Sequence, residues 1–457
     1  MTDKTLSFDE LLAAMPNLAS PDQMQRHMTD MSGFEAAMPS VVFRPVSTDQ
    51  VAAIVKTCAA EDRKITIQGG LTGLAGGARP NEGDVVIALE NMKQIEEIDT
   101  VGGVAIVQAG VILENLCTAV EQEGWYFPLD FGSRGSCVIG GNVSTNAGGN
   151  KVLRYGTTRD LVLGMEVVLP DGTVLNMLNR VIKNNTGLDL KHLFIGTEGR
   201  LGIITRLSLR LFPNPQTRAT ALVALDSFDS VTRMLKQARS DLPDLSSFEV
   251  MWQSYLQQAA VHAGKDVPFE GRYPIYVLVE IEGADKPVFH EGFSAFLESL
   301  LESGIGSDVI IPQTLEQANS LWQIRDAIGE ILGSIKPYVA FDISIPLKHM
   351  PEFIQQSTAA LEEKYPHSIN LLFGHLGDGN LHLTTGKHKE EDILAVEELV
   401  YMIASRFRGS ISAEHGIGRI KKPFLHYSRS EDEIKLMSAI KNLINPQDLF
   451  NAGRLVD

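Results

Sequence analysis

A glycine-rich stretch from Asp130 to Gly156, DFGSRGSCVIGGNVSTNAGGNKVLRYG, constrains the fold of this chain more than any other segment. It holds seven glycines, three asparagines and several hydroxyl side chains within 27 residues. This composition is too polar for a hydrophobic core and in places too apolar for a solvated linker. Its backbone can approach a ligand closely because glycine has no Cβ. The stretch therefore predicts a segment that binds a large, polar ligand.

Two further stretches have the same character. QGGLTGLAGG, Gln68–Gly77, directly follows a strand pattern, and its N–H groups could cradle an anion such as a pyrophosphate. LFIGTEGRLGIIT, Leu193–Thr205, is the third. No Gly-Lys-Ser/Thr follows the first, which excludes a Walker loop, and no Gly-x-Gly-x-x-Gly fingerprint opens a helix, which disfavours an NAD-dependent enzyme. Alone, Gln68–Gly77 could be a flexible turn, but three such stretches favour a ligand site.

The composition bounds the class of protein. A chain of 457 residues with 44% hydrophobic and 21% charged residues is typical of a globular protein of two or three domains. A net charge of -17 argues against nucleic acid and against a bare anionic membrane as partners. Cys58, Cys117 and Cys137 are odd in number and lack metal-ligand spacing, which favours a reducing compartment.

The N-terminal residues MTDKTLSFDELLAAM lack the basic region and apolar core of a signal peptide. No apolar run approaches the length of a transmembrane segment. We therefore expect a cytoplasmic protein that is not transmembrane, with peripheral attachment to the inner membrane left open.

Strand and helix patterns alternate from Val41 to about Phe212. Strands are expected at 41–45, 64–68, 84–90 and 104–111, a helix capped by Thr48, and a hairpin around Asp171-Gly172. LFPNPQTRAT then breaks the pattern with two prolines, and beyond it an antiparallel sheet covered by helices is expected. We therefore predict an α+β chain with domains at 1–213 and 214–410 and a C-terminal segment at 411–457.

FGHLGDGNLHLTT, Phe373–Thr385, places two histidines on either side of an Asp-Gly pair. If Asp378-Gly379 is the centre of a tight turn, His375 faces His382 and Leu376 faces Leu381. Directly opposed side chains lie about 5 Å apart, so both rings could reach one metal ion. Two ordinary polar residues near a loop are the alternative, and a third ligand would have to come from elsewhere.

Taken in order along the chain, these motifs resemble those of the FAD-binding oxidoreductases of the vanillyl-alcohol-oxidase type. The resemblance includes three further stretches, RYGTTRDLVLG, SISAEHGIG and FNAGR. Within this family the chain is similar to the D-lactate and D-2-hydroxyglutarate dehydrogenase branch and to the flavin subunit of glycolate oxidase. The resemblance extends over nearly the whole chain from about residue 35. It implies a two-subdomain FAD-binding domain and a cap domain with an antiparallel sheet covered by helices, which carries the metal histidines.

The resemblance also implies the residues that bind FAD. Covalent attachment in this superfamily usually uses a histidine of this domain, and none lies between His27 and His192, so we expect non-covalent FAD. Arg200 is a departure, since related chains usually carry Thr there; we expect it to alter the local loop but hardly FAD binding. The expected FAD-binding residues are Gly69, Gly70, Leu71, Thr72, Gly73, Leu74, Ser136, Gly140, Gly141, Thr145, Asn146, Gly149, Tyr155, Gly156, Glu198, Gly199, Ile203, Ile204 and Asn451.

By the same resemblance, His375, His382 and Glu414 bind a divalent metal. Two imidazoles and a carboxylate suit Zn²⁺, and Mn²⁺ or Fe²⁺ accept similar ligands. His415 would be the general base that takes the hydroxyl proton of a 2-hydroxy acid, and Arg325 would bind the substrate carboxylate.

Three positions bear on the substrate. The resemblance implies that D-2-hydroxyglutarate dehydrogenases carry polar groups for the distal carboxylate where this chain has Gly329, Ala340 and Thr384. We therefore expect a monocarboxylic D-2-hydroxy acid, D-lactate being the simplest, unless Lys336 supplies the missing cation.

Several alternatives and partners remain open. The alternatives are a D-2-hydroxyglutarate dehydrogenase, a flavin subunit of a glycolate-oxidase-like complex, and a zinc hydrolase. A quinone, a cytochrome or an electron-transfer flavoprotein would accept the electrons, and a homodimer is compatible with the sequence.

Overall fold

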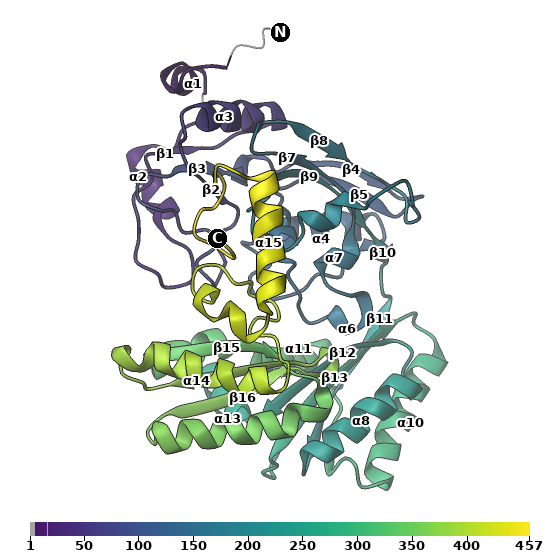
Figure 1. The fold of residues 1–457 in the computed structure, drawn as a ribbon. Helices are drawn as coiled ribbons and strands as arrows, with labels where there is room; N and C mark the ends of the chain where they lie inside the picture. The colour runs from purple at the N-terminus through teal and green to yellow at the C-terminus, as the bar shows by residue number, and fades with distance from the viewer. Residues whose placement is uncertain (1–4, 16) are drawn as a thin grey trace. The chain divides into compact units, whose positions relative to one another are not determined.

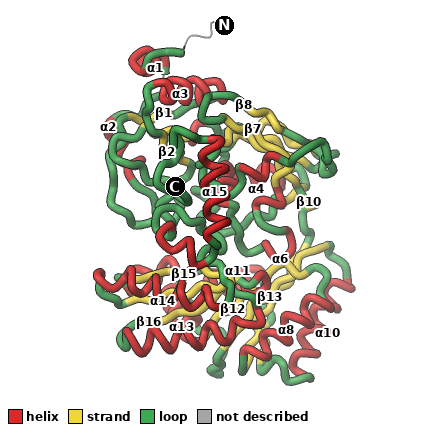
Figure 2. Tube along the Cα trace, viewed as in Figure 1, coloured by secondary structure: helices red, strands yellow, loops and turns green. Residues whose placement is uncertain are grey.

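The computed structural model describes residues 5–15 and 17–457, which form two compact units (Figure 1). The first comprises the described chain up to Gly149 together with Gly156–Asn214 and Glu414–Asp457. The second comprises Asn150–Tyr155 and Pro215–Ala413. Long loops make up much of the first unit, whereas helices and strands fill most of the second (Figure 2). No helix in the described part of the chain is long and apolar enough to cross a membrane.

A small parallel sheet opens the first unit. Its strands β1 (Val41–Phe43), β2 (Ile65–Gln68) and β3 (Val85–Ala88) lie in the order β1-β3-β2. Helix α3 (Thr48–Ala60) joins the first two and buries its apolar face. Its N-cap is Ser47, whose hydroxyl accepts from the N–H of Gln50, so the expectation that Thr48 caps the helix was wrong by one residue. The short helices α1 (Phe8–Ala14) and α2 (Pro21–Met24) precede this sheet.

A five-stranded antiparallel sheet completes the first unit, in the order β4-β5-β9-β7-β8. The expected hairpin around Asp171-Gly172 is confirmed, because β7 and β8 pair with Val168 opposite Val174. The strands are β4 (Ile95–Asp99), β5 (Val104–Gln108), β7 (Val162–Val168), β8 (Val174–Met177) and β9 (Ile203–Arg210), beside the pair β6 (Trp125–Tyr126) and β10 (Phe212–Pro213). Besides α1, α2 and α3, the first unit contains the helices α4 (Leu113–Gln122), α5 (Ile139–Thr145), α7 (Thr158–Leu161) and α15 (Glu431–Ile444).

The second unit is built on a seven-stranded antiparallel sheet in the order β14-β11-β13-β12-β16-β17-β15, which confirms the predicted sheet. Its strands are β11 (Thr217–Leu225), β12 (Leu245–Trp252), β13 (Ile275–Gly283), β14 (Asp308–Ile310), β15 (Tyr338–Ser344), β16 (Ile369–His375) and β17 (Asn380–Gly386). Its longer helices are α8 (Phe228–Asp241), α9 (Gln253–His262), α10 (Pro287–Glu302), α11 (Leu315–Arg325), α12 (Ile328–Leu332), α13 (Met350–Lys364) and α14 (Ile393–Arg406).

One face of this sheet packs against α9, α11 and α12. Tyr255 stacks on Phe373 with ring centroids 4.2 Å apart, and Leu321, Ile324 and Ile331 are buried in the same cluster. The apolar positions of α11 therefore face the sheet. Arg325 is the last residue of this helix, and its buried side chain reaches Glu249 on β12. Figure 1 shows α8, α10, α13 and α14 in front of the sheet.

The segment Asn150–Tyr155 joins the second unit although its chain neighbours on both sides belong to the first. It contains the short helix α6 (Val152–Tyr155), which packs against β12. Its anchor is Lys151, whose buried ammonium contacts Glu280 and Glu282 at 2.6 Å each. The sequence pattern of the glycine-rich stretch gave no sign of this anchor.

Candidate functional site

The three glycine-rich stretches meet within the first unit. A Cβ at Gly70 would lie 2.3 Å from the carbonyl oxygen of Ser136, so the first and second stretches are in backbone contact. The N–H of Glu198 donates to the carbonyl of Ser144 at 2.8 Å, which joins the third stretch to the second. Their convergence fits the prediction that they share one large ligand.

Three residues with side chains adopt left-handed backbone conformations there, and one of them is Leu71 (φ 62) in the first stretch. Asn146 (φ 53) ends α5, and its Oδ1 accepts from the N–H of Arg159 at 2.9 Å. Glu198 (φ 54) is buried, and its carboxylate accepts from the N–H groups of Ile417 and Gly418 at 2.7 and 2.8 Å. Such conformations cost about 1–2 kcal/mol each, and the surrounding bonds hold them. Constrained backbone of this kind is concentrated at ligand sites.

We expect Gly70→Ala to lower the flavin content of the purified protein. The methyl group would meet backbone atoms of Ser136 and Cys137, and overpacking of this kind costs about 1–3 kcal/mol. Gly132→Ala is the matched control, because no atom lies within 4 Å of a Cβ there. The absorbance ratio at 450 and 280 nm measures the flavin content, and equal ratios for both variants would contradict the close approach.

The other expected FAD residues are differently placed. Ile203 and Ile204 are buried in β9. Tyr155 belongs to the second unit, within Asn150–Tyr155. Asn451 is buried, and its amide accepts from the N–H of Ile67 at 2.9 Å and donates to the carbonyl of Glu198 at 2.6 Å. The amide of Asn451 therefore ties the end of β2 to the Glu198 turn.

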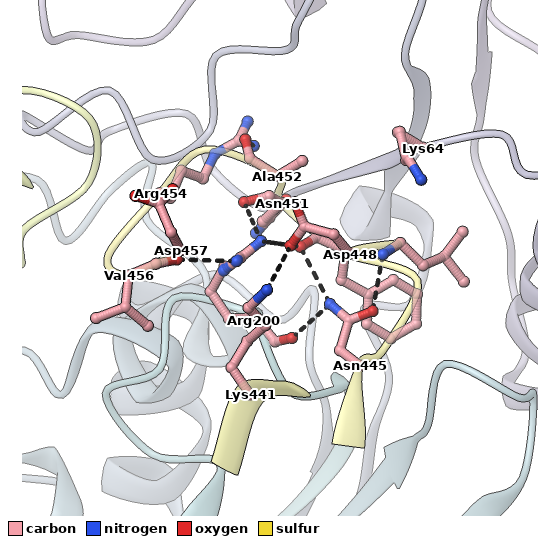
Figure 3. A network of polar contacts seen from close by, with 12 residues as sticks. Lys64, Arg200, Lys441, Asn445, Asp448, Asn451, Ala452, Arg454, Val456 and Asp457 are labelled. Atoms are coloured by element: carbon pink, nitrogen blue, oxygen red, sulfur yellow. Dashed lines mark hydrogen bonds and ion pairs between the residues drawn. The ribbon is translucent and has the colours of Figure 1, made fainter. Parts of the chain in front are cut away.

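Arg200 has a structural function that its sequence position did not reveal. Its buried guanidinium donates to the carbonyls of Phe450, Asn451 and Val456 at 2.9–3.0 Å and pairs with Asp448 at 2.7 Å (Figure 3). These bonds fasten the C-terminal segment to the turn that follows Glu198. Arg200 therefore links two segments of the first unit.

His375 and His382 lie together at one end of β16 and β17, with ring centroids 5.4 Å apart. The predicted register was wrong. His382 faces Phe373, and His375 faces Glu249 on β12. The chain turns through a short 3-10 helix, Leu376–Asp378, followed by left-handed Gly379, and this turn is wider than two residues. The shift is by two positions, so both rings stay on the same face of the sheet.

Glu414 follows Ala413, the last residue of the second unit, whose N–H donates to the carbonyl of Asp342 on β15. Among the described residues, ligand atoms of His375, His382 and Glu414 lie within 4.8 Å of one another. An imidazole pair with a carboxylate is a donor set that fits a divalent transition metal. His415 is the next residue along the chain.

Arg325 lies beside this group, at the end of α11. Its side chain is buried, and Nε and Nη2 donate to one oxygen of Glu249 at 2.8 and 2.6 Å. Nη1 donates to Asp326 at 3.1 Å. One edge of the guanidinium is therefore already occupied, and a substrate carboxylate would have to use the Nη1/Nη2 end, displacing the more exposed Asp326.

Glu249 is the residue that sequence reasoning missed. Its carboxylate is fully buried and contacts both Arg325 and Nδ1 of His375. Burial alone would raise the pKa of Glu249, but the charges of Arg325 and His375 outweigh it and hold the pKa below its ordinary value. Its only signal in the sequence is a single acidic residue within the strand LSSFEVMW.

Comparison with known proteins defines the class first. The FAD binding domain family model matches residues 39–178, and the model for the C-terminal domain of FAD linked oxidases matches residues 214–455. Alkyldihydroxyacetonephosphate synthase and p-cresol methylhydroxylase have the same fold. Each has a TM-score of 0.77 and 16% identity; the alignments cover 99% and 96% of this chain and 86% and 93% of theirs.

The chain belongs to the FAD-linked oxidases, and it binds FAD. It is 37% identical to a D-2-hydroxyglutarate dehydrogenase of Xanthomonas citri pv. viticola over 100% of this chain and 98% of that protein. It is also 37% identical to a putative mitochondrial D-lactate dehydrogenase of Schizosaccharomyces pombe, over 96% of this chain and 86% of that protein. The predicted family and fold are confirmed.

Proposed function

We propose that this protein is an FAD-dependent dehydrogenase that oxidises a D-2-hydroxy acid to the 2-oxo acid with the help of a divalent metal, preferably Zn²⁺. The observation that carries the proposal is the grouping of His375, His382 and Glu414 beside a buried arginine in a chain of this family. The names of the two 37%-identical relatives support the substrate class.

The chain's own residues would divide the chemistry among them. FAD supplies the hydride acceptor, and the metal would polarise the substrate hydroxyl. His375, His382 and Glu414 would hold the metal. The Nη1/Nη2 end of Arg325 binds the substrate carboxylate and orients Cα. His415 accepts the hydroxyl proton, since imidazole is well suited to general base catalysis near neutral pH.

The substrate we favour has one carboxylate, as in D-lactate. Ala340 on β15 and Thr384 on β17 are directly paired, so the two substitutions fall at one place in the sheet. No atom lies within 4 Å of a Cβ at Gly329, so steric crowding does not account for the absence of a larger residue there. Ala340 is exposed and supplies no cation, so a second carboxylate at this place would lack an ionic partner.

The reduced flavin must pass its electrons on. We propose a quinone, a cytochrome or an electron-transfer flavoprotein as the acceptor and the cytoplasm as the compartment, with peripheral attachment to the inner membrane left open. The three cysteines are all free thiols, which supports a reducing compartment such as the cytoplasm.

Anaerobic mixing of the purified yellow protein with D-lactate, L-lactate and D-2-hydroxyglutarate tests the proposal. We expect D-lactate to bleach the flavin band near 450 nm, a chelator to abolish bleaching, and added Zn²⁺ or Mn²⁺ to restore it. L-lactate serves as the stereochemical control.

Each other outcome has a definite meaning. Bleaching by D-2-hydroxyglutarate alone would overturn the monocarboxylic preference, with Lys336 the first candidate for the missing cation. Bleaching that resists the chelator would overturn the metal function. Bleaching that requires a partner protein would point to a subunit of a glycolate-oxidase-like complex, and a colourless, hydrolytic protein to a zinc hydrolase.

A further inference from the structure

Glu249 is central to this inference, because its carboxylate contacts two of the residues assigned to the site. Nδ1 of His375 lies 3.0 and 2.9 Å from its two oxygens. Nε and Nη2 of Arg325 lie 2.8 and 2.6 Å from Oε2. All three side chains are buried, so water screens these charges little.

The first consequence concerns the tautomer of His375. A carboxylate can only accept, so the Nδ1 of His375 carries the proton and donates it to Glu249. The lone pair that a metal ligand needs is then on Nε2. Nη2 of Arg325 lies 3.2 Å from both ring nitrogens. An atom equidistant from both lies over the ring face, since an approach in the ring plane would collide with Cε1.

The second consequence is electrostatic. A guanidinium over the face of His375 would repel a divalent cation bound to the same ring, because buried charges a few ångströms apart interact strongly. The Glu249 carboxylate balances this charge at hydrogen-bonding distance. The same carboxylate therefore orients the ligand and offsets the repulsion from the substrate-binding arginine.

The strand pairing explains how Glu249 is held there. Glu249 lies directly opposite His375 in the antiparallel pair of β12 and β16, so both side chains leave the same face of the sheet. Because both backbones are fixed by the ladder, the hydrogen bond is built into the fold.

We infer that Glu249 is a positioning residue for the metal: it fixes the tautomer and orientation of His375 and compensates the charge of Arg325. The inference rests on the proposed function, in which His375 is a metal ligand. Carboxylates that orient metal-bound histidines typically raise metal affinity by about 10–100-fold.

Glu249→Gln tests this, because glutamine keeps the size and one acceptor oxygen but removes the charge. Glu280→Gln is the matched control. Glu280 is a buried carboxylate of the adjacent strand β13, but it bonds to Lys151, Thr220 and Trp322. Both variants are purified with FAD, stripped of metal, and titrated with Zn²⁺ against a chromophoric chelator. The visible spectrum of the Co²⁺-loaded forms reports the geometry of the ligands.

We expect Glu249→Gln to weaken Zn²⁺ binding by about 10–100-fold and to change the Co²⁺ spectrum, with Glu280→Gln matching the wild type in both. Equal Zn²⁺ affinity for Glu249→Gln and wild type would overturn the inference. So would equal weakening in both variants, since that would show a general loss of stability. A wild-type protein that binds no Zn²⁺ or Co²⁺ would instead overturn the metal part of the proposed function.

Discussion

His415→Gln is expected to slow reduction of the flavin by D-lactate by about 10²–10⁴-fold, the usual contribution of a positioned general base. The substrate hydroxyl must lose its proton as hydride leaves Cα, and glutamine cannot accept it. The flavin content and the Zn²⁺ affinity should match the wild type, because His415 is not among the three grouped ligands. Anaerobic stopped-flow measurement at 450 nm gives the rate.

His426→Gln is the control for this variant. His426 belongs to the same C-terminal segment, but its ring is exposed, bonds to the nearby carbonyl of Pro423 and lies against Tyr427. We expect it to react like the wild type. The pH dependence separates the roles further: a limb of the wild-type rate profile should be absent from His415→Gln. A rate within threefold of the wild type would remove His415 from the chemistry.

Most of the fold could be predicted from local patterns in the sequence. Glycine, turn and alternation signals predicted the sheets, because each depends on neighbours in the chain. The Asp-Gly pair placed the turn between His375 and His382 correctly but not the register, since the 3-10 turn Leu376–Asp378 takes up extra residues. The two histidines still lie on one face of the sheet, because a shift of two positions preserves the face on which a side chain lies.

Glu249 and Arg200 show what the sequence could not provide. The function of Glu249 depends on a strand partner 126 residues away, and no local pattern specifies that pairing. Arg200 stands out only by comparison with relatives, and its partners lie some 250 residues further on. The roles of both residues depend on contacts between distant segments of the chain. Composition and periodicity carry no information about such contacts.

Lys151→Met should be the most destabilising of the substitutions considered for the second unit. The ammonium of Lys151 is buried between Glu280 and Glu282, at 2.6 Å from each. Removing it leaves two buried carboxylates without a cation, and breaking a buried pair in this way costs about 3–5 kcal/mol. Urea unfolding followed by tryptophan fluorescence measures the loss, since Trp252 and Trp322 belong to the second unit. Lys435→Met, at an exposed pair with Glu431, should change stability by less than about 1 kcal/mol.

The pH dependence of this loss identifies its cause. Burial alone would raise the pKa of Glu280, but Lys151 outweighs it and holds the pKa below its ordinary value of 4.5. A carboxyl group with a lowered pKa stabilises the fold above its unfolded-state pKa, and the stabilisation is lost as the pH falls through its folded-state pKa. In Lys151→Met the burial of Glu280 is no longer offset by Lys151, so its folded-state pKa should be raised. The difference in stability between wild type and Lys151→Met should therefore shrink as the pH falls through this raised pKa toward the lowered pKa of the wild type. A difference that stays constant into acid would assign the loss to packing of the lysine stem instead of its charge.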